Sequence, residues 1–163
     1  MKPISVKYPF VPKSNRSLIP GQFWAIPLHN GKFACGRVIE VHPFETKMFL
    51  AGLMDWIGEL IPNENDLTGK QTIKQGQIHI KAIYETALNK EILGYRNLYL
   101  DNIESYFFKS QDGYQLESSK LMKGYKEIRS LTKVESDIYP TFSTWGYDVI
   151  RILAEELSLS KKI

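Results

Sequence analysis

The sequence of 163 residues contains a single cysteine, Cys35, and only three histidines, His29, His42 and His79. One cysteine excludes an intramolecular disulfide framework. No two histidines have the short spacing of a zinc-binding pair, and one cysteine cannot complete such a set of ligands. We therefore expect a protein that binds no metal and no other cofactor.

Long apolar segments are also missing from the chain. No run approaches the roughly 18 apolar residues that are needed to cross a bilayer. Residues 1–20 contain lysines but lack the apolar core and the small-residue cleavage site of a signal peptide. The sequence therefore predicts a cytoplasmic protein without a membrane partner.

Signatures of catalysis are few. The sequence has neither a glycine-rich phosphate loop nor a G-x-S-x-G elbow. Cys35 shares a strand face with Arg37 and is close along the chain to His42, but a cysteine in a strand is more often a small buried apolar residue than a nucleophile. Asp55 and Glu59 would share a face only on a helix, whereas the local pattern favours a strand. We therefore expect a protein that is not an enzyme.

Proline and glycine divide the N-terminal part of the chain into an arm and a hairpin. Four prolines within residues 1–20 favour an extended arm that ends at Pro20-Gly21. Two apolar runs, 22–28 and 33–41, then flank Asn30-Gly31, which is a strong signal for a type I′ hairpin turn. Apolar residues occur on both alternating faces of these runs, which indicates a strongly curved sheet that is covered on both sides.

The rest of the chain adds shorter strands and one clear helix. Strands are predicted at 48–57, where Gly52 allows a bulge, at 77–84, and in the aromatic segments 96–99 and 105–109. Residues 62–76 are rich in loop formers, 85–91 fits one helical turn, Asp112-Gly113 marks a turn, and 121–131 fits no single element. Ser143 or Thr144 can cap an amphipathic helix over 145–158.

These elements predict an α+β fold in one domain, residues 1–163. Its centre is a strongly curved, mostly antiparallel sheet or a partly open small barrel. The N-terminal hairpin opens this sheet, and the C-terminal amphipathic helix packs on it.

Acidic residues are concentrated in one part of a chain whose net charge is +3. Residues 1–20 carry a net charge of +4, whereas residues 40–66 carry −5. An acidic surface attracts a basic partner and speeds its association. The candidate partner-binding residues are Glu45, Asp55, Glu59, Glu64 and Asp66. The other interpretation of this stretch is an ordinary solvated surface.

Aromatic residues make up 12% of the chain, which leaves a second class of function open. Basic residues interleaved with aromatic ones can form a stacking platform for single-stranded nucleic acid. The aromatic candidates are Tyr95, Tyr99, Tyr106, Phe107 and Phe108, and the basic ones are Lys81, Lys90, Arg96 and Lys109. A small-barrel nucleic-acid-binding module is therefore the alternative to a protein-binding function, and an aromatic core is the simpler explanation.

Several motifs of the chain resemble one known family. They comprise Pro20-Gly21-Gln22-Phe23-Trp24-Ala25-Ile26-Pro27-Leu28, Asn30-Gly31-Lys32-Phe33, Gly36-Arg37-Val38 and the later Ser143-Thr144-Trp145-Gly146. This arrangement resembles the immunity protein 26 family, whose opening looks like a Gly-x-aromatic-x-x-Ile-Pro-Leu strand, a glycine turn and an aromatic-x-x-Gly-Arg/Gln-Val strand. Segments Leu93-Gly94 and Arg96-Asn97-Leu98 fit the family more loosely.

The resemblance implies a bacterial immunity protein of polymorphic-toxin or contact-dependent competition systems. Such a protein stays in the cytoplasm of the producing cell and binds a cognate toxin domain, so that sibling cells survive. The family has no catalytic residues to carry over, and its opening motif looks structural. The resemblance implies no toxin-contacting residue and no oligomeric state.

Overall fold

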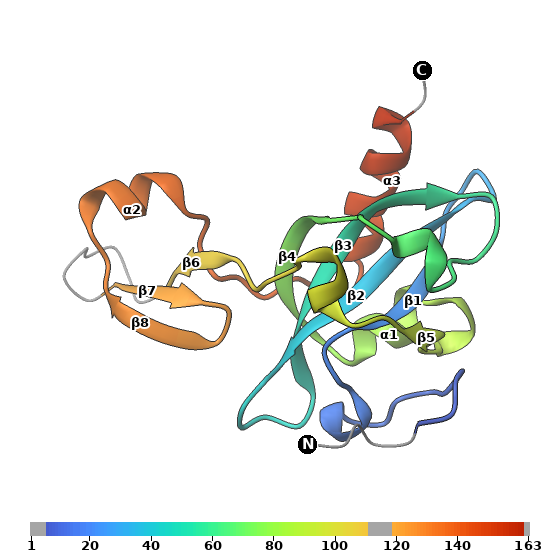
Figure 1. Cartoon of the computed structure of the whole chain (residues 1–163), viewed down its shortest axis with the longest axis horizontal. Helices are drawn as coiled ribbons and strands as arrows, with labels where there is room; N and C mark the ends of the chain where they lie inside the picture. The colour runs from blue at the N-terminus through green and yellow to red at the C-terminus, as the bar shows by residue number, and fades with distance from the viewer. Residues whose placement is uncertain (1–5, 111–118, 162–163) are drawn as a thin grey trace.

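The computed structural model describes residues 6–110 and 119–161 and contains two antiparallel sheets (Figure 1). The larger sheet has the order β4-β3-β2-β1-β5 and is not closed into a barrel. Its strands are β1 (Gln22–Pro27), β2 (Phe33–Val41), β3 (Met48–Gly58), β4 (Thr72–His79) and β5 (Gly94–Tyr95). The small sheet consists of β6 (Phe107–Lys109), β7 (Lys120–Lys123) and β8 (Lys126–Ser130).

Helices connect and cover these strands. The α-helices are α1 (Lys81–Thr86), α2 (Lys133–Ile138) and α3 (Val149–Ser160), and the 3₁₀ turns are η1 (Asn15–Ser17), η2 (Asn65–Leu67), η3 (Leu88–Lys90) and η4 (Leu98–Asp101). The predicted α+β class, the antiparallel sheet and the C-terminal helix are confirmed. The predicted turn at Asp112-Gly113 lies outside the described residues.

The N-terminal hairpin forms as predicted, although its turn is of another type. The Leu28 N–H donates to the Lys32 carbonyl at 2.9 Å, and the Gly31 N–H donates to the Leu28 carbonyl at 3.1 Å. Gly31 has a φ of +83°, but Asn30 is not among the described residues with positive φ. A type I′ turn needs positive φ at both central residues, so the expectation of that turn type is wrong. The connection is a three-residue loop in which only glycine adopts the left-handed conformation.

Both faces of the curved sheet are covered, as the alternation of the hairpin predicts. One face forms a core from Trp24, Ile26, Ala34 and Val38 of the hairpin with Ile150 and Ala154 of α3. The other face forms a core from Phe23, Cys35 and Ile39 of the hairpin with Leu67, Ile103 and Phe108. The second face of the sheet therefore carries η2, the segment after η4 and the small sheet.

The C-terminal helix begins later than the sequence predicts. The Gln77 N–H donates to the Ser143 carbonyl at 3.0 Å, and the Trp145 N–H donates to the Gln77 carbonyl at 2.8 Å. This segment extends along the edge of β4, so neither Ser143 nor Thr144 caps the helix, and α3 starts at Val149. The helix also contacts the hairpin tip, where the His29 N–H donates to the Glu155 carboxylate at 2.9 Å.

Two predicted strands are instead partly helical. The strand expected at 77–84 begins earlier, at Thr72, and ends at His79, whose Nδ1 accepts the Lys81 N–H at 3.0 Å as α1 begins. No strand forms at 96–99, because Leu98 and Tyr99 begin the 3₁₀ turn η4, which the Asn97 side chain caps by accepting the Tyr99 N–H at 2.9 Å. The ambiguous segment 121–131 forms most of the hairpin of β7 and β8.

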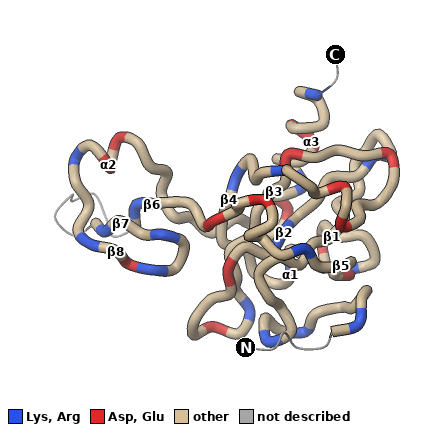
Figure 2. Tube along the Cα trace, in the orientation of Figure 1, with Lys and Arg blue, Asp and Glu red and all other residues tan. Residues whose placement is uncertain are grey.

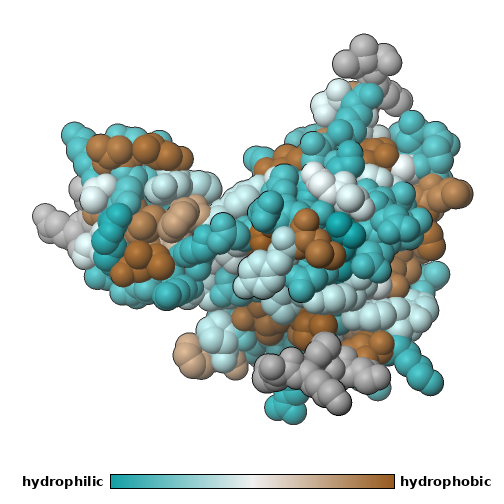
Figure 3. Space-filling model, viewed as in Figure 1, coloured by the Kyte–Doolittle hydropathy of each residue, from teal (hydrophilic) through white to brown (hydrophobic). Residues whose placement is uncertain are grey.

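The small sheet extends from the main sheet and is anchored to it by polar contacts (Figure 1). The Glu40 carboxylate of β2 accepts the Ser105 hydroxyl at 2.7 Å and the Tyr125 N–H at 3.3 Å. The Tyr125 hydroxyl donates to the Gln77 side chain at 2.8 Å. Hydrophobic residues remain on the surface over α2, including Val134 (Figure 3).

The N-terminal arm is partly pinned to the main sheet. Phe10 forms a bridge with Ile92, in which the Ile92 N–H donates to the Phe10 carbonyl at 2.8 Å. The Tyr8 hydroxyl accepts a hydrogen bond from Gln22 at 3.2 Å. The structure describes residues 6–20 of the arm that is expected to be extended, and in them bends at 8–9 and 13–14 and the turn η1 interrupt the chain.

Candidate functional site

The five acidic residues predicted from the charge distribution lie in different parts of the fold, and Figure 2 shows acidic positions spread over the molecule. Glu45 lies in the turn between β2 and β3, whereas Asp55, Glu59, Glu64 and Asp66 lie towards or beyond the other end of β3. An 11-residue strand such as β3 is about 36 Å long. The structure therefore separates Glu45 from the other four residues.

These four carboxylates differ in the ion pairs and hydrogen bonds that they already form within the protein. Asp55 pairs with Lys161 at 2.7 Å, and the exposed Glu59 lies 3.7 Å from Lys32. Asp66 has a structural role, because its carboxylate accepts the Asn63 N–H at 3.0 Å. Glu64 is exposed and forms no ion pair within the described part of the chain. The acids that remain open to a partner are therefore Glu64 and, in part, Glu59.

A buried ion pair that the sequence analysis missed holds η4 in place. The Arg96 Nε and Nη2 donate to the Asp101 carboxylate at 2.7 and 3.0 Å, and the Gly69 N–H donates to it at 2.8 Å. The Asp101 backbone carbonyl also accepts from the Gln71 side chain. The side chains of Arg96 and Asp101 are 11% and 2% exposed. These contacts join η4 to the loop that follows η2.

The same contacts shift the protonation of both partners. The hydrogen bonds from Arg96 lower the pKa of the Asp101 carboxyl below its ordinary value, and the Gly69 N–H lowers it further. The hydrogen bond to Asp101 raises the pKa of Arg96, and the nearby charge of Glu64 adds to this effect. The only sequence signal for this site was turn chemistry, because Asn97 and Asp101-Asn102 are residue types that favour caps and turns.

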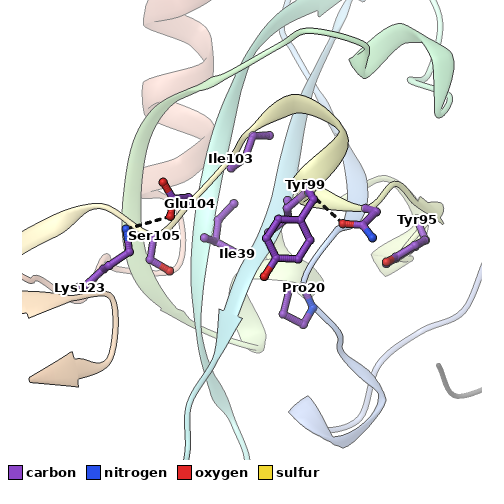
Figure 4. Close-up of a pocket in the computed structure, with 10 residues that line it drawn as sticks. Pro20, Ile39, Tyr95, Tyr99, Ile103, Glu104, Ser105 and Lys123 are labelled. Carbon is purple, nitrogen blue, oxygen red and sulfur yellow. Dashed lines mark hydrogen bonds and ion pairs between the residues drawn. The ribbon is translucent and has the colours of Figure 1, made fainter. Parts of the chain in front are cut away.

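An open cavity of about 380 Å³ lies beside η4 (Figure 4). It is lined by Pro20, Ile39, Tyr95, Asn97, Leu98, Tyr99, Ile103, Glu104, Ser105 and Lys123. Ile39 and Ile103 are buried and form its floor, whereas the Tyr99 side chain is 83% exposed and stands at its entrance. The Lys123 ammonium lies 3.2 Å from the Glu104 carboxylate on the opposite side. The cavity thus combines apolar and aromatic walls with one charged edge.

The possible thiol nucleophile of the sequence is buried in the core. Cys35 has no exposed surface, and burial raises the pKa of its thiol to about 12. Arg37 lies in the same part of the sheet, but its side chain donates to backbone carbonyls. Its Nε donates to the Gly21 carbonyl at 3.0 Å, and its Nη2 donates to the Arg96 carbonyl. His42 is seven strand residues away, or about 23 Å, and its Nδ1 accepts the Phe44 N–H at 3.0 Å. The described contacts therefore do not assemble an activated cysteine.

We expect Cys35 in the folded protein to resist a thiol reagent, because reaction requires an exposed thiolate. Labelling with a maleimide, followed by mass spectrometry, should show less than about a tenth of the modification that is found in urea, where the thiol is accessible. A folded protein that reacts as fast as the unfolded one would contradict the burial of Cys35. Labelling at pH 6.5 and 8.5 gives the matched comparison, since a reactive low-pKa thiol would label at both.

The aromatic residues proposed as a nucleic-acid platform divide between core and surface. Phe108 is buried, and Tyr106 packs against the same core. Tyr99, by contrast, is exposed and stands at the cavity. These residues therefore do not form one continuous exposed stacking surface.

Residues 6–110 and 119–161 contain neither a metal-binding cluster nor a membrane-spanning helix. No group of three or more histidine, cysteine, aspartate or glutamate side chains there could hold a metal ion. None of the helices described combines the length and the hydrophobicity that a membrane-crossing helix requires.

Comparison with known proteins places most of this architecture in one family. The sequence model of a family described as Immunity protein 26 matches residues 19–120. The matched region contains the whole larger sheet and β6, and it ends where β7 begins. No curated protein and no solved structure is significantly similar to the chain. Because the match spans more than half of the 163 residues, the chain belongs to the immunity protein 26 family.

Proposed function

We propose that this protein, acting as a single domain in the cytoplasm, binds a cognate bacterial toxin domain and neutralises it in a protein–protein complex. The observation that carries the proposal is the match of residues 19–120 to an immunity protein family. The environment of Cys35, the strongest catalytic candidate in the sequence, adds support. Its thiol is buried, and the neighbouring Arg37 side chain donates to a backbone carbonyl, so Cys35 is not activated as a nucleophile. Binding rather than catalysis therefore accounts best for the function.

The proposed contact surface is the acidic region at the far end of β3, next to η2. Glu59 and Glu64 are exposed there, and Leu60 beside them is also exposed. A partner with a basic surface would be drawn towards these carboxylates before contact, which raises the rate of association. Asp55 and Asp66 belong to the same proposed surface, but their carboxylates are held by Lys161 and Asn63.

The function is tested by co-expression with the toxin genes that neighbour this gene. We expect at least one neighbouring product to stop growth of a bacterial host and this protein to restore growth. The two purified proteins should then form a one-to-one complex. If no neighbouring product is toxic, or none is neutralised, the proposed function is wrong.

The acidic surface is tested by reversing Glu59 and Glu64 to lysine. We expect the double variant to associate with the toxin about ten- to a hundredfold more slowly at low salt, because it replaces attraction with repulsion. Stopped-flow or surface plasmon resonance measurements at two salt concentrations would show this effect shrinking as salt rises. Asp66 is left unchanged, because its carboxylate accepts the Asn63 N–H and its loss would disturb the loop.

Glu85→Lys is the matched control, because it reverses an exposed acid on α1, whose buried residues Ala82 and Ile83 belong to the core on the other face of the sheet. It should leave the association rate within about twofold of the wild-type rate, since its charge is far from the proposed contact and is screened. Equal rates for wild type and for the Glu59/Glu64 variant would remove this surface from the interface. That result would not contradict the proposal that the protein neutralises a toxin.

A further inference from the structure

We propose that the cavity beside η4 receives an arginine side chain of the toxin. This inference rests on the proposed function and specifies the chemistry of the partner at one site. The cavity lies on the face of the sheet that carries η2, η4 and the small sheet, and Arg96, which holds η4 through Asp101, is influenced by the charge of Glu64. It therefore adjoins the acidic surface proposed for toxin binding.

The shape and lining of the cavity suit a long side chain with a flat cationic end. Its buried floor of Ile39 and Ile103 offers apolar contact to the methylene groups of an arginine. Tyr99 stands at the entrance and Tyr95 further along the same wall (Figure 4). A guanidinium group is attracted to the face of a tyrosine ring, and this attraction strengthens when the site is shielded from water.

Carboxylates supply the matching charge. The Glu104 side chain at the edge is 70% exposed, and a second carboxylate, Glu40, accepts the hydroxyl of the lining residue Ser105 at 2.7 Å. The negative charge of Glu40, together with that of Glu45, adds to the effect of burial in raising the pKa of the nearby Tyr125. An incoming cation would therefore enter a region that already favours positive charge.

The free protein already places one cation in this region. The Lys123 ammonium lies 3.2 Å from the Glu104 carboxylate and 4.8 Å from the centre of the Phe107 ring. A carboxylate accepts two parallel hydrogen bonds from a guanidinium, which an ammonium cannot provide. A toxin arginine could therefore contact Glu104 and the Tyr99 ring together, with Lys123 as a competing cation that moves aside.

The wall of the cavity is held in place before any partner binds. Asp101 ties η4 to Arg96 and Gly69, and the Asn97 side chain caps the same turn. Preorganisation of this kind lowers the ordering cost of binding and favours affinity. The ring of Tyr99 is thus presented from a fixed turn, even though the side chain itself is exposed.

The test uses the toxin domain that passes the growth-rescue experiment, with its activity removed by mutation, and measures affinity by isothermal titration calorimetry. Tyr99→Ala and Glu104→Gln should each weaken binding about tenfold. Tyr99→Phe should bind within about twofold of wild type, because the ring face rather than the hydroxyl attracts a cation. Lys123→Ala should keep or raise the affinity, since it removes the competing cation.

Leu100→Ala is the matched control, because Leu100 is exposed on the same turn but does not line the cavity. It should leave the affinity unchanged. If Tyr99→Ala and Glu104→Gln bind the toxin as tightly as wild type, or if Lys123→Ala loses affinity, no toxin arginine occupies this cavity. A wild-type protein that binds no neighbouring toxin is a different result, because it overturns the proposed function itself.

Discussion

Replacing Asp101 with asparagine is expected to lower the free energy of unfolding by about 3–5 kcal/mol at pH 7, the cost of breaking a buried ion pair from one side. The substitution leaves Arg96, which is 11% exposed, without its bidentate partner. It also weakens the acceptor of the Gly69 N–H. Chemical denaturation followed by tryptophan fluorescence would measure the loss.

The unfolding free energy that is lost in Asp101→Asn should decrease as the pH falls. The pKa of Asp101 is lower in the folded protein than its ordinary value of about 3.9, so its ionised form stabilises the fold above that pH. This contribution disappears as the pH falls through the lowered pKa of the folded state. The difference in unfolding free energy between wild type and Asp101→Asn should therefore be constant near neutral pH and shrink below about pH 4.

Asp55→Asn provides the control for this experiment. Asp55 also forms an ion pair, with Lys161 at 2.7 Å, but both side chains are about half exposed. Exposed pairs contribute little, so the expected loss is below about 1 kcal/mol. Equal losses for the two variants, or a loss at Asp101 that does not change on acidification, would contradict the role given to the buried pair.

The N-terminal hairpin could be predicted because its information is local. Alternating apolar residues and the Asn30-Gly31 pair are enough to place two adjacent strands, and both cores formed on the predicted faces. The turn type was wrong because the same dipeptide also suits a three-residue loop in which only Gly31 has positive φ. Local sequence thus determined the pairing but not the conformation of the turn.

Elements whose conformation depends on distant contacts were predicted less well. The segment 96–99 is predicted as a strand from its local sequence, yet Leu98 and Tyr99 begin η4, whose last residue, Asp101, contacts Gly69 and Gln71 about 30 residues earlier. The start of α3 was misplaced because the residues before Val149 pair with Gln77 of β4. Periodicity alone contains no information about such partners.

The candidate site likewise has one feature that the sequence predicts, its acidic charge, and one that it does not, the cavity. A run of acidic residues is visible in the sequence, but the carboxylate of Asp66 is held by a local turn and Glu45 lies at the other end of β3. The cavity is formed by Pro20, Ile39, Tyr99 and Lys123, which are separated by up to about a hundred residues. Only the fold brings these residues together, so charge was predictable and the cavity was not.

Replacing Gly36 with alanine is expected to destabilise the protein by about 2–3 kcal/mol, because the added methyl group overpacks the core. Gly36 pairs directly with Trp24 across the hairpin. A Cβ at this position would lie 2.2 Å from the Trp24 Cε2, and the indole that it meets is fully buried. Gly36 belongs to the motif by which the chain resembles its family, and the contact with Trp24 gives a physical reason for a glycine at this position of the chain.

A double-mutant cycle isolates the contact between the two residues. Trp24→Leu removes the atoms that the new methyl group would meet, so Gly36→Ala should cost less than about 1 kcal/mol in that background. Gly146→Ala is the control, because a Cβ there meets only Val149 at an ordinary 3.8 Å. Thermal and urea unfolding of the wild type, the two single variants and the double variant would measure the coupling. If Gly36→Ala costs the same with and without the indole, the strain arises elsewhere, and close packing against Trp24 is not the reason for a glycine in this strand.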